Sequence, residues 1–249
     1  MSNNAHAAGV LRDGISLFFP AYNEESNVGA VIEKATEVLA PLNCNYEIII
    51  VDDGSKDNTA KIVKSHATRH KNVVLKRHEK NQGYGAALQT GFRSATLGLV
   101  FFSDCDRQFD LGELSTFLEM MNQDPEIDAV VGYRIKRADP WFRRLNAFGW
   151  KLWSRVMFGL KVRDVDCAFK LFKREMLKNI VIESTGALIN IEILSKLKNM
   201  GAKIVEKGVR HYPRTAGSQT GAKLKVILKA FYESFKLYGK IRRFKKGLK

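Results

Sequence analysis

The chain of 249 residues is poor in cysteine and contains no long apolar run, and each shortage excludes a class of protein. No window holds the roughly 18 uninterrupted apolar residues of a membrane-spanning helix, so we expect no such span. Cys44, Cys105 and Cys167 form no CxxC pair or Cys/His cluster, which argues against a disulfide framework or structural zinc and favours a reducing compartment. Glycine loops of the GxxxxGKS/T and strand-linked GxGxxG types are also missing, so a dinucleotide oxidoreductase is not expected.

Charge is present in excess but is divided unevenly along the chain. Up to Gly132 there are 12 Lys and Arg against 18 Asp and Glu, a net charge of −6, whereas from Tyr133 onward there are 29 against 8, a net charge of +21. A strongly basic half indicates a polyanionic partner, either nucleic acid or an anionic membrane surface. A basic surface that only adds solubility is the plainer alternative.

The length fits one domain with appendages. We expect a disordered start over residues 1–12, one α/β domain over 13–221 and a basic amphipathic helix over 222–249. Short apolar runs predict strands, and apolar residues at helical spacing predict helices between them. The expected strands are 15–19, 46–51, 73–75, 99–103, 127–133, 169–172 and 203–212, and the expected helices are 28–39, 57–68, 83–95, 111–122, 189–200 and 224–238. Alternation of strands and helices predicts a mainly parallel, Rossmann-like sheet flanked by helices.

Two carboxylates follow the fourth expected strand. Asp104 and Asp106 are one residue apart and come directly after an apolar run, which places them at the carboxyl edge of the sheet, where open α/β sheets bind ligands. Like charges so close repel each other unless a cation lies between them. Mg²⁺ and Mn²⁺ commonly take one or two carboxylates together with water and substrate phosphates. The pattern therefore predicts a metal site for a nucleotide diphosphate, and a solvated turn is the alternative.

Two further polar clusters end the first and second strands, over residues 20–25 and 51–59. In a parallel sheet both open at the same edge as Asp104. Acidic side chains there can accept hydrogen bonds from a base N–H and from ribose hydroxyls. Taken alone, residues 52–55 would be a plausible turn and residues 23–25 a plausible helix start.

The order of these motifs resembles that of the inverting family-2 glycosyltransferases. The resemblance rests on residues 19–25, residues 51–55 with Asp57 and Thr59, residues 81–83, and residues 104–108. It implies a GT-A fold, hexosyltransferase activity, a nucleotide-sugar donor such as GDP-mannose or a UDP-hexose, and Mg²⁺ or Mn²⁺ as cofactor. Asp-x-Asp-x-Gln and residues 164–170 further resemble the dolichol-phosphate mannose synthase group, which includes bacterial polyprenyl-phosphate glycosyltransferases.

Carried over to this sequence, the resemblance implies three sets of site residues. The donor would be bound by Pro20, Ala21, Tyr22, Glu24, Asp52, Asp53, Gly83 and Asp104. The metal would be held by Asp104, Asp106 and Gln108. The catalytic set would be Asp106, Asp166, Arg134 and Arg214. Alternatives stay open for two of these: Asp166 could be a structural carboxylate paired with Arg163 or Lys170, and Arg134 could be an ordinary surface arginine. The histidines His66 and His78 are expected at the surface.

The acceptor decides which groups are needed. A phosphate monoester is already anionic at neutral pH, so it needs cations such as Arg214 rather than a base, and arginine's planar fork suits phosphate. A polyprenyl phosphate is therefore the expected acceptor, and the basic half of the chain would bind it. A hydroxyl acceptor such as a glycolipid or polysaccharide, with Asp166 as base, is the alternative. The sequence departs from the group where many synthases read Ser-Gly-Phe and this chain reads Cys167-Ala168-Phe169.

A lipid-linked acceptor must be met at a bilayer. Residues 141–158 interleave aromatic and basic side chains and contain all 3 Trp residues of the chain, and residues 222–249 carry ten Lys and Arg with Glu233 as the one acid. Such segments are typical of peripheral attachment to anionic membranes. We therefore expect a cytoplasmic protein, peripheral on the cytoplasmic face of a membrane. No nucleic-acid partner is expected, because the strand-end carboxylates would repel its phosphates.

Overall fold

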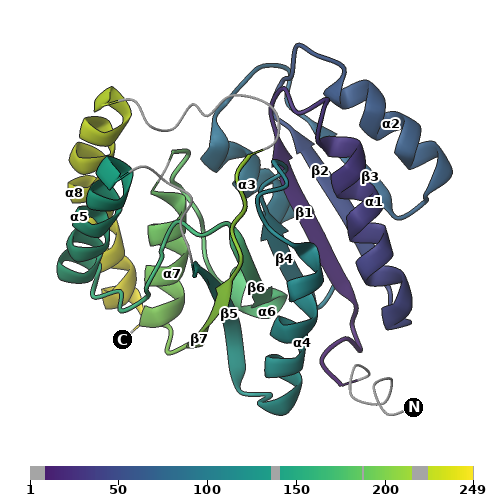
Figure 1. Ribbon diagram of the computed structural model, residues 1–249. Coiled ribbons are helices and arrows are strands. Elements are labelled where there is room, and N and C mark those ends of the chain that lie inside the picture. The colour runs from purple at the N-terminus through teal and green to yellow at the C-terminus, as the bar shows by residue number, and fades with distance from the viewer. Residues whose placement is uncertain (1–8, 136–140, 187, 215–223, 249) are drawn as a thin grey trace.

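A computed structural model describes residues 9–135, 141–186, 188–214 and 224–248. Its centre is a seven-stranded sheet with the order β3-β2-β1-β4-β6-β5-β7 (Figure 1). The strands are β1 (Ile15–Ala21), β2 (Tyr46–Asp52), β3 (Val73–Arg77), β4 (Leu99–Ser103), β5 (Ile127–Arg134), β6 (Phe169–Lys173) and β7 (Lys203–Val209).

The sheet is parallel apart from β6, which runs antiparallel to both of its neighbours, β4 and β5. The mainly parallel α/β fold predicted from the sequence is confirmed. The chain passes from β3 back across the sheet to β4, so β1 and β4 lie side by side although their connections leave in opposite directions. Such a switch point opens a crevice at the carboxyl ends of the two strands. Because β6 is reversed, the segment that precedes it reaches this same edge of the sheet.

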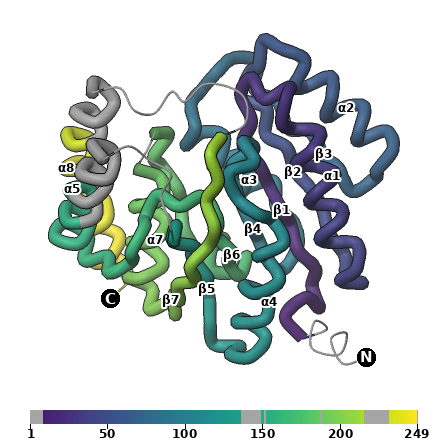
Figure 2. Tube along the Cα trace, viewed as in Figure 1, coloured from purple at the N-terminus to yellow at the C-terminus, as the bar shows by residue number. Residues whose placement is uncertain are grey.

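Helices cover both faces of the sheet. The helices are α1 (Val28–Leu39), η1 (Ala40–Leu42), α2 (Thr59–Arg69), α3 (Tyr84–Ser94), η2 (Leu111–Glu113), α4 (Leu114–Gln123), α5 (Trp141–Phe158), α6 (Arg174–Lys178), α7 (Ile189–Asn199) and α8 (Leu224–Gly247). One buried cluster joins the sheet to α1, α2 and α4, and a second joins it to α3, α6, α7 and the ends of α5 and α8. Figure 2 shows α5 and α8 as a pair at the margin of the second layer.

The central strands form because nearly every side chain in them can be buried. All five residues of β4 and six of the seven in β1 are buried, which is what a strand covered on both faces requires. On the α3 side, Phe18, Phe92, Phe102 and Phe172 form a contiguous aromatic cluster, with ring centroids 4.8 Å apart for Phe18 and Phe92 and 5.4 Å for Phe18 and Phe102. This packing fixes β4, and with it the two aspartates that follow.

Two differences from the sequence-based expectations concern the start of the chain and one short helix. Residues 9–12, expected in a disordered start, form turns in which Leu11 is buried and the Val10 N–H donates to Asn122 Oδ1 at 3.3 Å. The short helix α6 was not expected, and its five residues are too few to show helical periodicity. The expected final helix is confirmed as α8, which packs on the domain through Leu237 and Ile241. The boundary near residues 221 and 222 falls outside the described residues.

Candidate functional site

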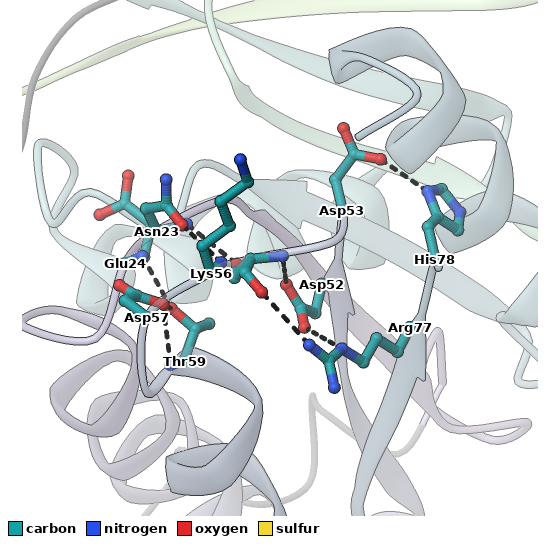
Figure 3. A network of polar contacts seen from close by, with 10 residues as sticks. Asn23, Glu24, Asp52, Asp53, Lys56, Asp57, Thr59, Arg77 and His78 are labelled. Carbon is teal, nitrogen blue, oxygen red and sulfur yellow. Dashed lines mark hydrogen bonds and ion pairs between the residues drawn. The ribbon is translucent and has the colours of Figure 1, made fainter. Parts of the chain in front are cut away.

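The loops after β1 and β2 are joined by backbone N–H groups of one loop that donate to side chains of the other (Figure 3). The Asn23 N–H donates to Ser55 Oγ at 2.9 Å, and the Glu24 N–H donates to Thr59 Oγ1 at 2.8 Å. Asp57 accepts from the Glu25 N–H at 3.1 Å and from the Thr59 N–H, the first of α2, at 2.9 Å. The first two sequence motifs therefore form one rigid rim.

Asp52 ends β2 with a fully buried side chain. Its Oδ1 accepts from the Ser55 N–H at 2.9 Å, and its Oδ2 lies 3.0 Å from Arg77 Nε. Gly54, in the turn between, has a φ of +72°, and a Cβ there would lie 2.6 Å from the Lys80 carbonyl carbon. The glycine thus lets the loop after β2 pack directly on the loop that leads to α3.

Asp53 turns the other way and organises the start of α3. Its carboxylate accepts from the Gln82 N–H at 2.9 Å and the Gly83 N–H at 2.8 Å, and it lies 2.7 Å from His78 Nδ1. His78 also contacts Thr90 Oγ1 through Nε2, at 2.9 Å. The expectation that His78 lies at the surface is wrong: its side chain is 11% exposed and joins Asp53 to α3. His66 is likewise buried.

The residues expected to bind the donor line the same edge. Pro20 and Ala21 are the last residues of β1, Ala21 being buried, and Tyr22 follows them with 38% of its surface exposed. Gly83 precedes the first residue of α3 with a φ of +97°. The structure therefore gathers the donor set around the crevice between β1 and β4, while the role of each residue stays a prediction.

Asp104 and Asp106 lie directly beyond β4, as predicted. Burial, and then the charge of Asp106, raise the pKa of Asp104 to about 7. The Asp106 side chain accepts from the Gln108 N–H at 3.1 Å. Among the described residues no group of three or more His, Cys, Asp and Glu could enclose a metal ion. The pair nevertheless fits Mg²⁺ or Mn²⁺, which commonly takes one or two carboxylates and completes its shell with water and phosphate.

Gln108 connects this loop to the segment after β7. Its Nε2 donates to the Tyr212 carbonyl at 2.9 Å, and the Tyr212 N–H donates to the Gln108 carbonyl at 2.8 Å. A short antiparallel bridge between Phe109 and His211 extends this contact. The side-chain nitrogen of Gln108 is therefore used structurally, and its amide oxygen is the atom that suits a metal.

Arg214 joins the basic half of the chain to the acidic half. Its guanidinium donates to Glu24 Oε1, and its Nη1 lies 3.7 Å from Asp106 Oδ2. The Arg214 side chain is 16% exposed and that of Glu24 is 11% exposed. Glu24 Oε2 also accepts from Asn27 Nδ2 at 2.7 Å. Three predicted site residues from three separate motifs thus meet at one point.

Arg134 is the last residue of β5, and Asp166 lies in the segment before β6. Arg134 makes a two-pronged contact with Asp164, Nε to Oδ2 at 2.6 Å and Nη2 to Oδ1 at 2.9 Å. Burial alone would lower the pKa of Arg134, but the bond to Asp164 raises it well above its usual value. This pairing replaces the open surface arginine that was the alternative. Asp166 is exposed, two residues further on.

A fully buried lysine supports the segment that carries Asp166. Lys170, in β6, donates to the Cys167 carbonyl and to Asn190 Oδ1 at 3.1 Å, and its ammonium lies 5.3 Å from the centre of the Phe102 ring. Burial lowers the pKa of Lys170, and the nearby carboxylates oppose that effect. Lys170 and Arg134 thus fix the turn before β6 from both ends.

An open cleft of about 420 Å³ lies beside Asp104. Its walls include Phe19 of β1, Val31 of α1 and Tyr212, and Ser103 and Asp104 lie along it. Sequence reasoning did not single out Tyr84, whose hydroxyl donates to Asp104 Oδ1 at 3.0 Å. Its position between Gly83 and Gly85 at the start of an expected helix is the signal that could have pointed to it.

The sheet order and the strand-end carboxylates define a GT-A fold. Glucosyl-3-phosphoglycerate synthase from Mycobacterium tuberculosis, solved with Mn²⁺, uridine diphosphate and phosphoglyceric acid, has a similar structure with a TM-score of 0.73. The two proteins are 19% identical, and the similarity covers 95% of this chain and 81% of that chain. The protein is therefore of the GT-A class.

The family follows from the sequence comparisons. The model described as Glycosyl transferase family 2 matches residues 16–181, so the chain belongs to that family and is a glycosyltransferase. It is 33% identical over 206 residues to an uncharacterized protein of Methanocaldococcus jannaschii, covering 76% of this chain and 84% of that protein. It is 32% identical over 178 residues to a dolichyl-phosphate beta-glucosyltransferase of Trichomonas vaginalis, covering 66% of this chain. The chain spans about half, 54%, of that enzyme.

None of the described helices combines the length and apolarity that crossing a bilayer requires.

Proposed function

We propose that this protein transfers a sugar, with inversion, from a nucleotide-sugar such as GDP-mannose or a UDP-hexose to a polyprenyl or dolichyl phosphate at a membrane surface. The observation that carries the proposal is the meeting of Arg214, Glu24 and Asp106. A cation from the basic half lies beside the carboxylates that would hold the donor and its metal. An arginine in that place can guide a second phosphate to the reacting centre.

The donor side follows from the edge of β1, β2 and β4. The rim of Asp52, Tyr22 and Glu24 would bind the nucleoside, and Asp104 and Asp106 would hold a divalent cation. Such a cation neutralises the charge that grows on the leaving diphosphate. The M. tuberculosis synthase, solved with Mn²⁺ and uridine diphosphate, supports a metal-dependent donor site of this kind.

The acceptor side follows from charge and from the named relative. A phosphate monoester with a second pKa of about 6 is already ionised near neutral pH, so the protein needs cations to orient it rather than a base. The name of the T. vaginalis relative, a dolichyl-phosphate beta-glucosyltransferase, supports a lipid phosphate as acceptor. Arg134 is paired with Asp164, whereas Arg214 lies beside Glu24 and Asp106 on the donor side, and this position makes Arg214 the stronger candidate to meet that phosphate.

A hydroxyl acceptor is the second candidate, and the exposure of Asp166 favours it. Asp166 lies in the turn that Arg134 and Lys170 fix through Asp164 and Cys167, so a base at this position would be held in place. In that case Asp166 would take the proton of the attacking alcohol.

A donor and acceptor panel tests the proposal. The purified protein is incubated with UDP- and GDP-sugars, Mg²⁺ or Mn²⁺, and either a short polyprenyl phosphate or the corresponding polyprenol. We expect transfer to the phosphate and none to the alcohol. Transfer to the alcohol that is lost in Asp166→Asn would establish the second candidate instead. Failure to turn over any nucleotide-sugar with either acceptor would overturn both.

The membrane surface is proposed from the paired helices α5 and α8. Large apolar side chains are exposed on both, namely Leu152, Val156, Tyr232, Phe235 and Tyr238, and Leu248 directly after α8 is exposed as well. Exposed cations accompany them along α8, namely Lys236, Arg242, Arg243, Lys245 and Lys246. Apolar side chains flanked by lysine and arginine suit the headgroup region of an anionic bilayer.

The tryptophans have a different role from the one expected. Trp150 and Trp153 pack against Phe231 of α8, with ring centroids 5.4 and 5.3 Å apart, and Trp153 Nε1 donates to Ser234 Oγ at 3.0 Å. They hold the two helices together instead of facing outward. The side chain of Trp141 lies outside the described residues.

Vesicle flotation tests the membrane proposal. Arg242→Glu/Arg243→Glu should float with anionic vesicles several-fold less than the unchanged protein in 0.1 M salt, because each basic residue near such a surface contributes about 1 kcal/mol. Lys61→Glu/Lys64→Glu on α2 alters the charge equally at exposed sites far along the chain and should float normally. Binding should fade towards 1 M salt, where the screening length falls to about 3 Å. Equal flotation of the two variants would contradict the proposed surface.

A further inference from the structure

Tyr84 lies between the two halves of the donor site. It is the first residue of α3, and its hydroxyl donates to Asp104 Oδ1 at 3.0 Å. Within the described part of the chain this is the hydrogen bond that the structure gives the Asp104 carboxylate.

The backbone that carries Tyr84 is held from the sheet side. Asp53 accepts hydrogen bonds from the Gln82 and Gly83 N–H groups, which are the two peptide groups directly before Tyr84. His78 braces the same carboxylate, and its other ring nitrogen contacts Thr90 one and a half turns along α3. Asp53 and α3 therefore cannot shift independently of each other.

The same backbone is held from the opposite side by the loop before α7. A Cβ on Gly85 would overlap the carbonyl of Thr185, so the helix lies directly on that loop. Gln89 Nε2 donates to the Ser184 carbonyl at 3.0 Å, one turn further along α3. The loop is itself fixed, because buried Glu192 accepts from the Glu183 N–H at 3.0 Å and from the Ser184 N–H at 2.7 Å.

We propose that Tyr84 is a positioning residue of the donor site: its hydroxyl fixes the Asp104 carboxylate through Oδ1 and leaves Oδ2 for the divalent cation of the nucleotide diphosphate. This inference rests on the proposed function, since it concerns the metal-dependent donor. Two clamped loops, one from each half of the chain, aim a single hydroxyl at one carboxylate oxygen. A hydrogen bond to a charged group that is held in advance avoids the entropy of ordering it on binding.

Tyr84→Phe tests the inference because it removes the hydroxyl and keeps the ring. Calorimetric titration with Mn²⁺ and UDP should show about 10-fold weaker binding, the size expected for one hydrogen bond to a charged group. Tyr46→Phe, at the start of β2 and thus at the opposite edge of the sheet, is the matched control and should bind like the unchanged protein. Thermal unfolding in EDTA shows whether both variants remain folded.

A double-mutant cycle distinguishes positioning from direct contact with the nucleotide. If Tyr84 acts through Asp104, then Tyr84→Phe should add less than about 2-fold to the loss already caused by Asp104→Asn. A full 10-fold loss in the Asp104→Asn background would overturn the positioning role, as would unchanged Mn²⁺ and UDP binding by Tyr84→Phe alone. If the unchanged protein binds neither UDP nor GDP with metal, the proposed function fails first, and the inference fails with it.

Discussion

Replacing Asp104 or Asp106 with alanine should lower sugar transfer by at least about 100-fold, as expected when one electrostatic stabiliser is removed from an active site. Asp104 accepts a hydrogen bond from Tyr84, and Asp106 lies beside Arg214, so each carboxylate has its own position and its own partner. Turnover of the nucleotide-sugar and calorimetric binding of UDP and GDP with Mn²⁺ both measure the loss. Asp124→Ala, an exposed carboxylate after α4 that pairs with Lys203, is the control and should retain activity.

Replacing Asp104 should lower activity but raise the stability of the metal-free protein. The folded protein raises the pKa of Asp104 from 3.8 to about 7, so folding favours the protonated carboxyl. This group therefore destabilises the metal-free protein increasingly as the pH rises from about 4 to about 7, and it gives no penalty below that window. Asp104→Asn should accordingly raise the melting temperature in EDTA at pH 8 by a few degrees, because about 1 kcal/mol shifts it by about 2–4 °C in a domain of this size.

Two results would contradict these predictions for activity and for stability. Full activity in EDTA, or in the Asp104→Ala protein, would remove the metal assignment. A lower melting temperature for Asp104→Asn at pH 8 would show that the carboxylate is a stabilising group and not a strained one.

Replacing Arg214 with alanine should lower kcat/KM for polyprenyl phosphate by about 100-fold, mainly through KM. Arg214 faces both Glu24 and Asp106, and its loss would leave the mostly buried Glu24 carboxylate without this cation. Removing one partner of a buried ion pair commonly costs about 3–5 kcal/mol of stability, here at the Glu24 side of the site. The acceptor phosphate would also lose the cation that orients it. Arg214→Lys should recover only part of the loss, because an ammonium lacks the guanidinium fork.

Steady-state kinetics with each substrate varied in turn measures this effect. Lys207→Ala removes an exposed cation from β7 and serves as the control. The acceptor KM should rise more than the donor KM in Arg214→Ala. An unchanged acceptor KM would exclude Arg214 from the acceptor site and would direct attention to Asp166.

Local features of this structure were predictable from the sequence because a buried strand appears as a short run of apolar residues. The apolar run that forms β4, and the Asp-x-Asp that follows it, locate the carboxylates without any knowledge of the partner strands. The helix expected over 57–68 is confirmed as α2, and the contact from the Thr59 N–H to Asp57 at its start spans only two residues. The GT-A fold and the family were likewise accessible from the order of the motifs.

Contacts between distant segments were not predictable in the same way. The pairing of Arg134 with Asp164 depends on the reversed direction of β6, which no local pattern reveals. His78 looks like a surface histidine in the sequence, and its contact with Asp53 arises only when the segments after β2 and β3 pack together. The hydrogen bond between the Tyr84 hydroxyl and Asp104 likewise depends on how the start of α3 packs beside the loop after β4.

The order of strands in the sheet also determines when each can find its partners during synthesis. Strands β1 to β4 pair with one another, so this unit is complete once residue 103 has left the ribosome. β5 has no such partner behind it, because its neighbours β6 and β7 both come later in the chain. Until β6 is made, the apolar β4 remains an open sheet edge, and open edges of this kind template aggregation. A nascent chain paused between β4 and β6 is therefore the form that most needs a chaperone.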